Sequence, residues 1–270
     1  MTATQWIRAD THVHFHACFQ EGPFLDAAAE ALIGRKSPGS DVHAALCLTE
    51  SHGTNWFGRL LGLDEEAVLS DSGWRISRTA ESNSVIARDN RGHALAIMAG
   101  RQIVCEEGLE VLALGYPLDI DDGQPIRSVM RQVVDAGAIS VVPWGFGKWI
   151  GARGSVVRDL INNPPCQFVM GDNGGRLAGF AEPGLFREAR DRQIDILPGT
   201  DPFPFGWDSQ RVGSFGIEWP GALDVARPFA DFKALVLDKK NPGKVFGDLE
   251  SIPFFIRNQL AIQLRRFAPG

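Results

Sequence analysis

Three of the six histidines of the chain lie on alternate positions near its start, as His12, His14 and His16. In a strand, alternate side chains point to the same face, so we expect the three imidazoles to face one way. Imidazoles at this spacing can share a divalent ion, because zinc and related ions accept ring nitrogens at about 2.0–2.1 Å. The alternative is a half-exposed strand with its polar residues in solvent. We favour the metal site, because three groups that acquire charge together in mild acid suit a solvated surface poorly.

Two further clusters follow apolar runs of the sequence. Glu50 and His52 are again two residues apart. The alternative for this cluster is a loop in which Thr49 or Ser51 caps a helix. Asp201 lies in a Gly/Pro-rich segment and precedes a proline, which is also common in turns.

Together, these clusters resemble the motifs of the PHP (polymerase and histidinol phosphatase) family of metal-dependent phosphoesterases. The opening His-x-His of that family is similar to HVH at 12–14, and its Thr-Asp-His motif is similar to TESH. There Glu50 replaces the aspartate, and His52, or less well Ser51, replaces the histidine. The final Gly-Ser-Asp-x-His is similar to GTDPF at 199–203. The resemblance covers most of the chain and implies a distorted (β/α)7 TIM-like barrel.

The chain departs from the family pattern at several ligand positions. Gln102 stands where a bridging carboxylate is expected, and Glu110, Val142 and Phe203 stand where histidines are expected. The ligands that remain imply one ion, or two with altered geometry. Their mixed nitrogen and oxygen donors suit zinc, manganese or iron. The expected metal ligands are His12, His14, His16, Glu50, His52, Glu110 and Asp201.

A Gly- and Trp-rich segment, PWGFGKWIGARG at 143–154, supplies cations near the position of the missing histidine. We expect Lys148 there, or Arg211 from another loop, to orient an anionic group of the substrate in place of a lost metal. Arg153, Trp144 and Gln102 are the expected substrate contacts. The alternative is that Lys148 and Arg153 are solvated loop residues.

A fourth polar cluster, Asp172 and Asn173 in GDNGGR, follows another apolar run. The resemblance implies that polar residues at this strand end enter the site. Two glycines come next, so we favour the alternative that these two residues form a turn.

The elements that must position these residues alternate between strands and helices, which favours one α/β domain over 1–270 with a mostly parallel sheet. We expect strands at Trp6–His14, Ala44–Thr49, Ala94–Val104, Leu109–Leu114, Ile139–Pro143, Cys166–Met170, Ile194–Leu197 and Lys233–Leu237. We expect helices at Leu25–Ile33, Asp64–Leu69, Ile126–Ala136, Val156–Ile161, Leu185–Arg192 and Pro253–Phe267.

Composition limits the partners and the compartment. A net charge of −6 argues against broad binding to nucleic acid or to a membrane surface, but not against a small anionic substrate held by local cations. The four cysteines are scattered and form no CxxC pair, which favours reduced thiols. Since the N-terminus also has no apolar centre typical of a secretory signal, we expect a cytoplasmic protein.

The sequence therefore predicts a metal-dependent hydrolase, specifically a phosphoesterase acting on a small phosphorylated substrate. The first alternative is a catalytically inactive relative that binds or regulates. A second is an amidohydrolase, which also begins with His-x-His. That family has further histidines at later strand ends, and only His93 follows His52 here.

Overall fold

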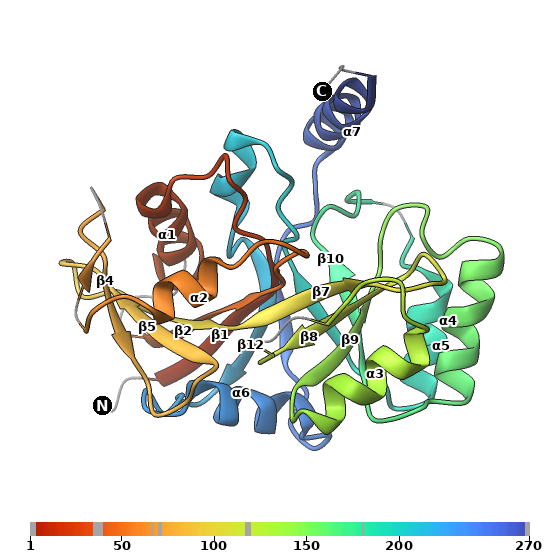
Figure 1. Cartoon of the computed structure of the whole chain (residues 1–270), viewed down its shortest axis with the longest axis horizontal. Coiled ribbons are helices and arrows are strands. Elements are labelled where there is room, and N and C mark those ends of the chain that lie inside the picture. Colours follow the sequence, from red (N-terminus) through yellow and green to blue (C-terminus); the bar gives the residue numbers. More distant parts are fainter. Residues whose placement is uncertain are drawn as a thin grey trace.

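The computed structural model describes residues 4–34, 40–65, 67–69, 72–116, 120–179 and 181–267 (Figure 1). Its strands form two sheets, one of eight strands and one of five. The eight-stranded sheet has the spatial order β13 (Lys244–Gly247), β12 (Phe215–Pro220), β1 (Thr4–Val13), β2 (Ser40–Leu48), β6 (Ala94–Met98), β5 (Ser84–Arg88), β4 (Arg75–Arg78) and β3 (Ala67–Val68). Only β1, β2 and β6 are parallel neighbours within it.

The five-stranded sheet carries the second half of the α/β alternation. Its order is β11 (Ile196–Gly199), β10 (Val169–Asn173), β9 (Ile139–Pro143), β8 (Glu110–Leu114) and β7 (Gly100–Val104). Strands β9, β10 and β11 are parallel, whereas β8 is antiparallel to both of its neighbours. The carboxyl ends of β9, β10 and β11 therefore lie at one edge of the sheet, where the glycine-rich loops begin.

Helices cover the outer faces of both sheets, as Figure 1 shows. On the eight-stranded sheet these are α1 (Glu21–Ala29), which continues as a π-helical turn (Glu30–Gly34), and α2 (Trp56–Leu61). On the five-stranded sheet they are α3 (Ile126–Asp135), α4 (Ala152–Asn162) and α5 (Gly184–Asp191). The inner faces share one apolar core with α6 (Pro228–Leu237). A 3-10 helix, η2 (Gly206–Arg211), precedes β12, and the C-terminal helix α7 (Ile252–Phe267) projects from the body.

The predicted TIM-like barrel is wrong, because the described strands form two separate sheets. The edge of β1 that a closed barrel would join to β11 is occupied by the antiparallel strand β12, with Ile7 opposite Trp219. On the other side, β6 continues into the antiparallel strands β5, β4 and β3. The sheets meet through a few backbone bonds at strand ends, such as that from Asp201 N to His12 O at 2.8 Å.

Several element predictions also need correction. The predicted strand Ala94–Val104 is two strands in different sheets, β6 and β7, which separate at Ala99. The predicted strand Lys233–Leu237 is part of α6, because its apolar residues belong to a helical face that begins with Pro228. The predicted helix Asp64–Leu69 contains the short strand β3. The predicted, mostly parallel sheet also needs correction. Parallel pairing is found in two sets of three strands, β1, β2 and β6 in one sheet and β9, β10 and β11 in the other.

Glycine at the end of β11 allows that strand to approach β1 closely. A Cβ atom at Gly199 would lie 2.3 Å from His12 N and 2.5 Å from His12 Cβ. Real Cβ atoms do not tolerate such separations, so a side chain here would force β11 and β1 apart. Gly199 therefore sets the distance between the strand that carries the histidine pair and the loop that carries Asp201.

We predict that Gly199→Ala lowers the free energy of unfolding by about 1–3 kcal/mol, as overpacking against fixed backbone does. Urea denaturation followed by circular dichroism measures this. The matched control is Gly184→Ala at the start of α5, where an added Cβ meets nothing within 4 Å. That variant should stay within about 0.5 kcal/mol of the wild type. Equal urea midpoints for Gly199→Ala and Gly184→Ala would show that β11 and β1 are not in close contact at Gly199.

Candidate metal centre

The two predicted histidines and the predicted aspartate meet in space. Within the part of the chain that the structure describes, ligand atoms of His12, His14 and Asp201 all lie within 4.8 Å of one another. His12 and His14 come from the end of β1 and are buried. Asp201 comes from the loop after β11 and retains some exposure. The group therefore joins the two sheets at the edge where β1 and β11 end.

The distances within this group match the edges of a coordination polyhedron. His12 Nε2 lies 3.2 Å from His14 Nε2, and Asp201 Oδ1 lies 3.5 Å from the first nitrogen and 3.4 Å from the second. Two ligand atoms about 2.05 Å from one ion and separated by a tetrahedral angle lie about 3.3 Å apart. The three atoms thus form a face on which one ion fits, and the remaining position is free for water or substrate.

An irregularity in β1 turns the histidines toward this face. Ile7 and Ala9 point into the core between the sheets, whereas Val13 packs into the core under α1 and α2. The odd-numbered side chains thus change face, and the pairing of β1 with β2 shifts register between Asp10 and Val13. A bulge of this kind re-aims side chains near a site. His12 therefore points inward, although regular alternation from Arg8 would place it on the outer face.

Asp201 is held in place by backbone and side-chain contacts. Its φ of 48° lies in the left-handed region, which aspartate and asparagine tolerate better than most residues. Its Oδ2 accepts a short hydrogen bond from Asn173 Nδ2, which leaves Oδ1 directed at the two imidazoles. Asn173 Oδ1 also accepts from Gly175 N at 2.7 Å. The predicted turn over Asp172 and Asn173 needs correction, because both residues end β10 and the turn follows them, closed by the bond from Arg176 N to the Asn173 carbonyl at 2.9 Å. The Asn173 side chain instead positions the Asp201 carboxylate.

The protonation states favoured by this environment are those that bind a cation. Burial lowers the pKa of His12 and outweighs the opposing effect of the Asp201 carboxylate. Burial alone would raise the pKa of Asp201, but His12, a hydrogen bond with His14 and the charge of Lys148 hold that pKa well below its usual range. A neutral imidazole and an ionised carboxylate are the forms that ligate metals.

Asp10 fixes the backbone around the cluster. This fully buried carboxylate accepts hydrogen bonds from Thr200 N and Gly213 N, both at 2.9 Å, from the Thr200 hydroxyl, and from His12 N at 3.3 Å. Burial raises the pKa of Asp10 to about 6, although these hydrogen bonds oppose the rise. Asp10 therefore ties β1 to the loops after β11 and η2 without contributing a ligand atom to the cluster. The sequence by itself assigned no role to Asp10, although it lies two residues before His12.

Gln102, Glu110 and Lys148 border the cluster. Gln102 Oε1 lies 3.3 Å from His12 Nε2, so the residue that replaces the expected carboxylate does reach the site. Glu110 acts electrostatically on His12 but forms a short ion pair with Lys148 Nζ. The ammonium of Lys148 in turn acts on Asp201. The pair places one cation and one anion beside the histidines.

Four of the expected ligands lie outside the triad: Glu110, which pairs with Lys148, and Glu50, His52 and His16. Glu50 accepts backbone hydrogen bonds from Trp56 N and Phe57 N at the start of α2, and burial raises the pKa of Glu50. His52 is exposed on the loop before α2. The ring of His16 stacks on that of His14 with centroids 5.4 Å apart, and His16 Nε2 donates to the Pro202 carbonyl at 2.8 Å.

The other expected substrate-binding residues have structural contacts of their own. Arg211 bonds to Glu250 Oε1 at 3.2 Å and to the Gly174 carbonyl at 3.0 Å. Arg153, in the first turn of α4, donates to the Gly147 carbonyl in the preceding loop. Trp144 is half-buried and packs on the core under α3, α4 and α5. Among the expected cations, Lys148 is thus the one that the structure brings to the histidines.

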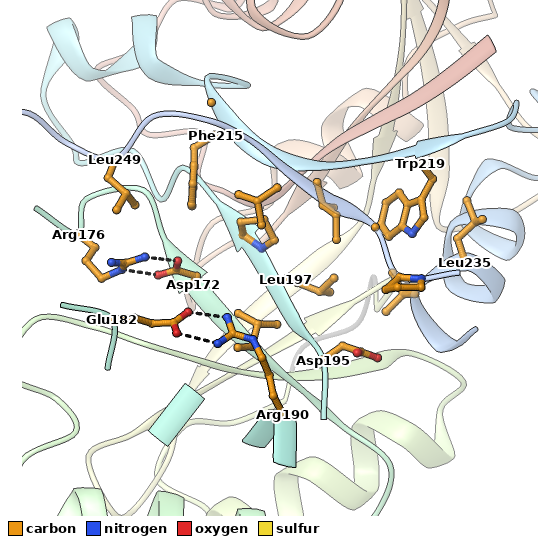
Figure 2. A pocket seen from close by; sticks show the side chains of 18 of the residues that line it. Asp172, Arg176, Glu182, Arg190, Asp195, Leu197, Phe215, Trp219, Leu235 and Leu249 are labelled. Carbon is orange, nitrogen blue, oxygen red and sulfur yellow. Dashed lines mark hydrogen bonds and ion pairs between the residues drawn. The ribbon is translucent and has the colours of Figure 1, made fainter. Parts of the chain in front are cut away.

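A separate cavity of 510 Å³ lies between β11 and the pair β12 and β13 (Figure 2). Asp172 lines it, next to Asn173 on β10, and adjacent strand residues point to opposite faces. Figure 2 shows its charged wall, in which Arg176 pairs with Asp172 and Arg190 pairs with Glu182. Both arginines are neutralised within the wall. The cavity is therefore distinct from the histidine cluster and shows no unpaired arginine for an anion.

The fold and site together define a mixed α/β protein of two sheets with a two-histidine, one-carboxylate group at their junction. No protein-family model matches the chain, and no curated protein matches it. Among solved structures, the chain is similar to PsfC from Pseudomonas syringae PB-5123, with a TM-score of 0.59 and 14% sequence identity. The alignment covers 98% of this chain and 100% of that chain. At this identity the similarity shows a shared fold.

Proposed function

We propose that the protein binds one divalent transition metal through His12, His14 and Asp201 and hydrolyses a small phosphate ester. The observation that carries the proposal is the convergence of two imidazole nitrogens and one carboxylate oxygen at separations of 3.2–3.5 Å. The resemblance to PHP motifs supports the same three ligands.

The donor set suits zinc, manganese or iron, each of which accepts mixed nitrogen and oxygen ligands. When bound, such an ion lowers the pKa of a coordinated water and polarises a phosphoryl oxygen. The residues of the chain hold the ion and set its surroundings. Asn173 orients Asp201, and the Gln102 amide lies beside His12.

The charge distribution supports an anionic substrate. Lys148 is partly exposed and lies close enough to Asp201 to affect the carboxylate, whereas its partner Glu110 is more buried. A phosphate that approaches the cluster would meet the Lys148 ammonium and could displace it from Glu110. Lys148 is therefore the residue that we assign to anion binding. Two histidines and one carboxylate also bind iron in non-haem iron oxygenases. We favour the hydrolase here because the Lys148 ammonium beside the cluster suits an anionic substrate.

The first test is elemental analysis of protein purified without chelator. We expect about one equivalent of zinc, manganese or iron in the wild type and loss of that metal in the double variant His12→Ala/His14→Ala. His52→Ala is the matched control and should retain the metal, because His52 lies outside the triad. A metal-free wild type whose stability EDTA does not change would exclude the metal site.

The second test is hydrolysis of small phosphate monoesters and diesters by the metal-loaded protein. We expect turnover that requires His14 and falls at least about tenfold in Lys148→Gln, because one charge-assisted contact to the anion is lost. Stoichiometric metal without hydrolysis of any ester would instead support the catalytically inactive binding protein. Loading by iron alone with oxygen consumption would support an oxygenase.

We also propose a cytoplasmic location. All four cysteines are unpaired thiols, which is typical of a reducing compartment. In the part of the chain that the structure describes, no helix has both the length and the apolar character needed to cross a membrane.

A further inference from the structure

The C-terminal helix α7 carries an apolar stripe that the body of the protein does not cover. Ile252, Ile256, Leu260 and Leu264 are each four residues apart and are between 51% and 71% exposed. Residues at this spacing follow one side of a helix. The stripe therefore extends over the length of α7, which projects from the rest of the molecule in Figure 1.

The opposite side of α7 is anchored to the body. Asn258 is fully buried, donates to Glu250 Oε1 at 2.7 Å and accepts from Trp207 Nε1 at 3.2 Å. Arg211 binds the same Glu250 oxygen. This buried polar network sets the direction of α7. The exposed stripe is therefore a fixed feature of the surface.

Further exposed apolar side chains lie beside the side of α7 that faces the body. Phe146, in the loop after β9, contacts the ring of Phe255 with centroids 5.5 Å apart, and Ile150 lies in the same loop. Trp207 of η2 contacts Asn258. Among the residues that the structure describes, twelve large apolar ones are exposed, and eight of these belong to α7, this loop or η2: Phe146, Ile150, Trp207, Ile252, Phe254, Ile256, Leu260 and Leu264. We call this set the α7 surface.

The α7 surface has two parts, the stripe and the four apolar residues beside the body-facing side of α7. Each member contributes on the order of 100 Å², so the two parts together offer roughly 800 Å² of apolar side chain. A stable dimer buries about 800 Å² per partner. One copy of the α7 surface is therefore large enough to form half of a dimer interface.

We propose that the α7 surface is the interface of a homodimer in which α7 of each copy packs on the body of the other. Charge favours this occupant. Helix α7 contains three arginines and no acidic residue, whereas the other residues contain 24 Lys and Arg against 33 Asp and Glu, a net charge of −9. The helix is thus attracted to the body of a second copy, and the same acidic body is repelled by an anionic membrane.

The test is sedimentation velocity of the full chain over a micromolar concentration series. We expect a dimer for the wild type and a dissociation constant raised at least about a hundredfold in Leu260→Glu/Leu264→Glu, because two apolar contacts become buried charges. Phe146→Glu tests the body half of the interface independently and should also weaken the dimer. The matched control is Val225→Glu, an equally exposed apolar residue outside the α7 surface, which should remain dimeric.

Far-ultraviolet circular dichroism and urea denaturation of each variant establish that it is folded. A wild type that is monomeric throughout the series would overturn the proposal, as would a folded double variant that dimerises like the wild type. Co-sedimentation of a monomeric wild type with phosphatidylserine vesicles would assign the α7 surface to a membrane instead. Loss of the dimer in Val225→Glu would place the interface elsewhere.

Discussion

Asp201→Asn is expected to weaken the binding of Co²⁺, used as a spectroscopic probe, by more than about a hundredfold. Loss of an outer residue that only orients a ligand already lowers metal affinity about 10–100-fold, and Asp201 provides a ligand atom itself. Asparagine is the suitable replacement, because it tolerates the positive φ of 48° at this position and has nearly the same shape. The change therefore removes the charge and leaves the local backbone as it is.

The absorption of Co²⁺ in the visible range, followed during titration of metal-stripped protein, measures this affinity. Asn173→Ala is the comparison for a residue that acts through another, since it removes the hydrogen bond to Asp201 Oδ2 and keeps all three ligand atoms. We expect that variant to lose about 10–100-fold in affinity. Unchanged Co²⁺ affinity in Asp201→Asn would mean that the carboxylate is not a ligand and that the convergence of the three side chains serves stability alone.

Asp10→Ala is expected to lower the free energy of unfolding by about 3–5 kcal/mol. Each buried donor left without an acceptor costs about 1–3 kcal/mol, and the fully buried Asp10 accepts four hydrogen bonds. Urea denaturation gives the value. The effect is large because three of the four bonds join β1 to loops that come from much later in the chain.

Two further variants separate this network from the loss of a charge. Asp10→Asn keeps one carbonyl oxygen, and the Thr200 hydroxyl can reverse its bond to accept from the new amide, so the loss should be smaller than for alanine. Asp121→Ala removes an exposed carboxylate and should change stability by less than about 0.5 kcal/mol. A loss in Asp10→Ala no greater than that in Asp121→Ala would show that the four bonds do not stabilise the fold.

Local pattern predicted the strands and helices where a regular period repeats over an uninterrupted run. The strand near Ile139–Pro143 and the helix near Ile126–Ala136 are present as β9, which is buried on both faces, and α3, which buries one consistent face. The prediction was wrong where the period is short or mixed. The apolar run in Lys233–Leu237 fits a strand or a helix equally, and its burial in the core between the sheets selects the helix.

The arrangement of the sheets was not accessible from local pattern. Alternation of strands and helices predicts parallel pairing, but it does not show which strand occupies which edge. Antiparallel β12, inserted beside β1, decides that the structure is two sheets and not a barrel. That pairing depends on residues about two hundred positions apart in the chain, which no local signal connects.

For the candidate site, the sequence by itself determined which residue types are available: two imidazoles two positions apart on a strand, and an aspartate in a glycine-rich loop. Only the tertiary structure decided which carboxylate joins them. Glu50 and Asp201 are both carboxylates that follow a strand, so either could join the histidines. The oxygens of Glu50 bind backbone N–H groups of α2, whereas Asp201 Oδ1 lies within 3.5 Å of both imidazoles.

The physical reason is that spacing along a strand sets the relative direction of neighbouring side chains, while their absolute direction depends on pairing. The register shift between Asp10 and Val13 turns His12 and His14 inward, and the absence of a side chain at Gly199 lets β11 bring Asp201 to them. Both features arise from contacts between strands. The ligand types could therefore be predicted from the sequence, whereas their convergence is a property of the packed sheets.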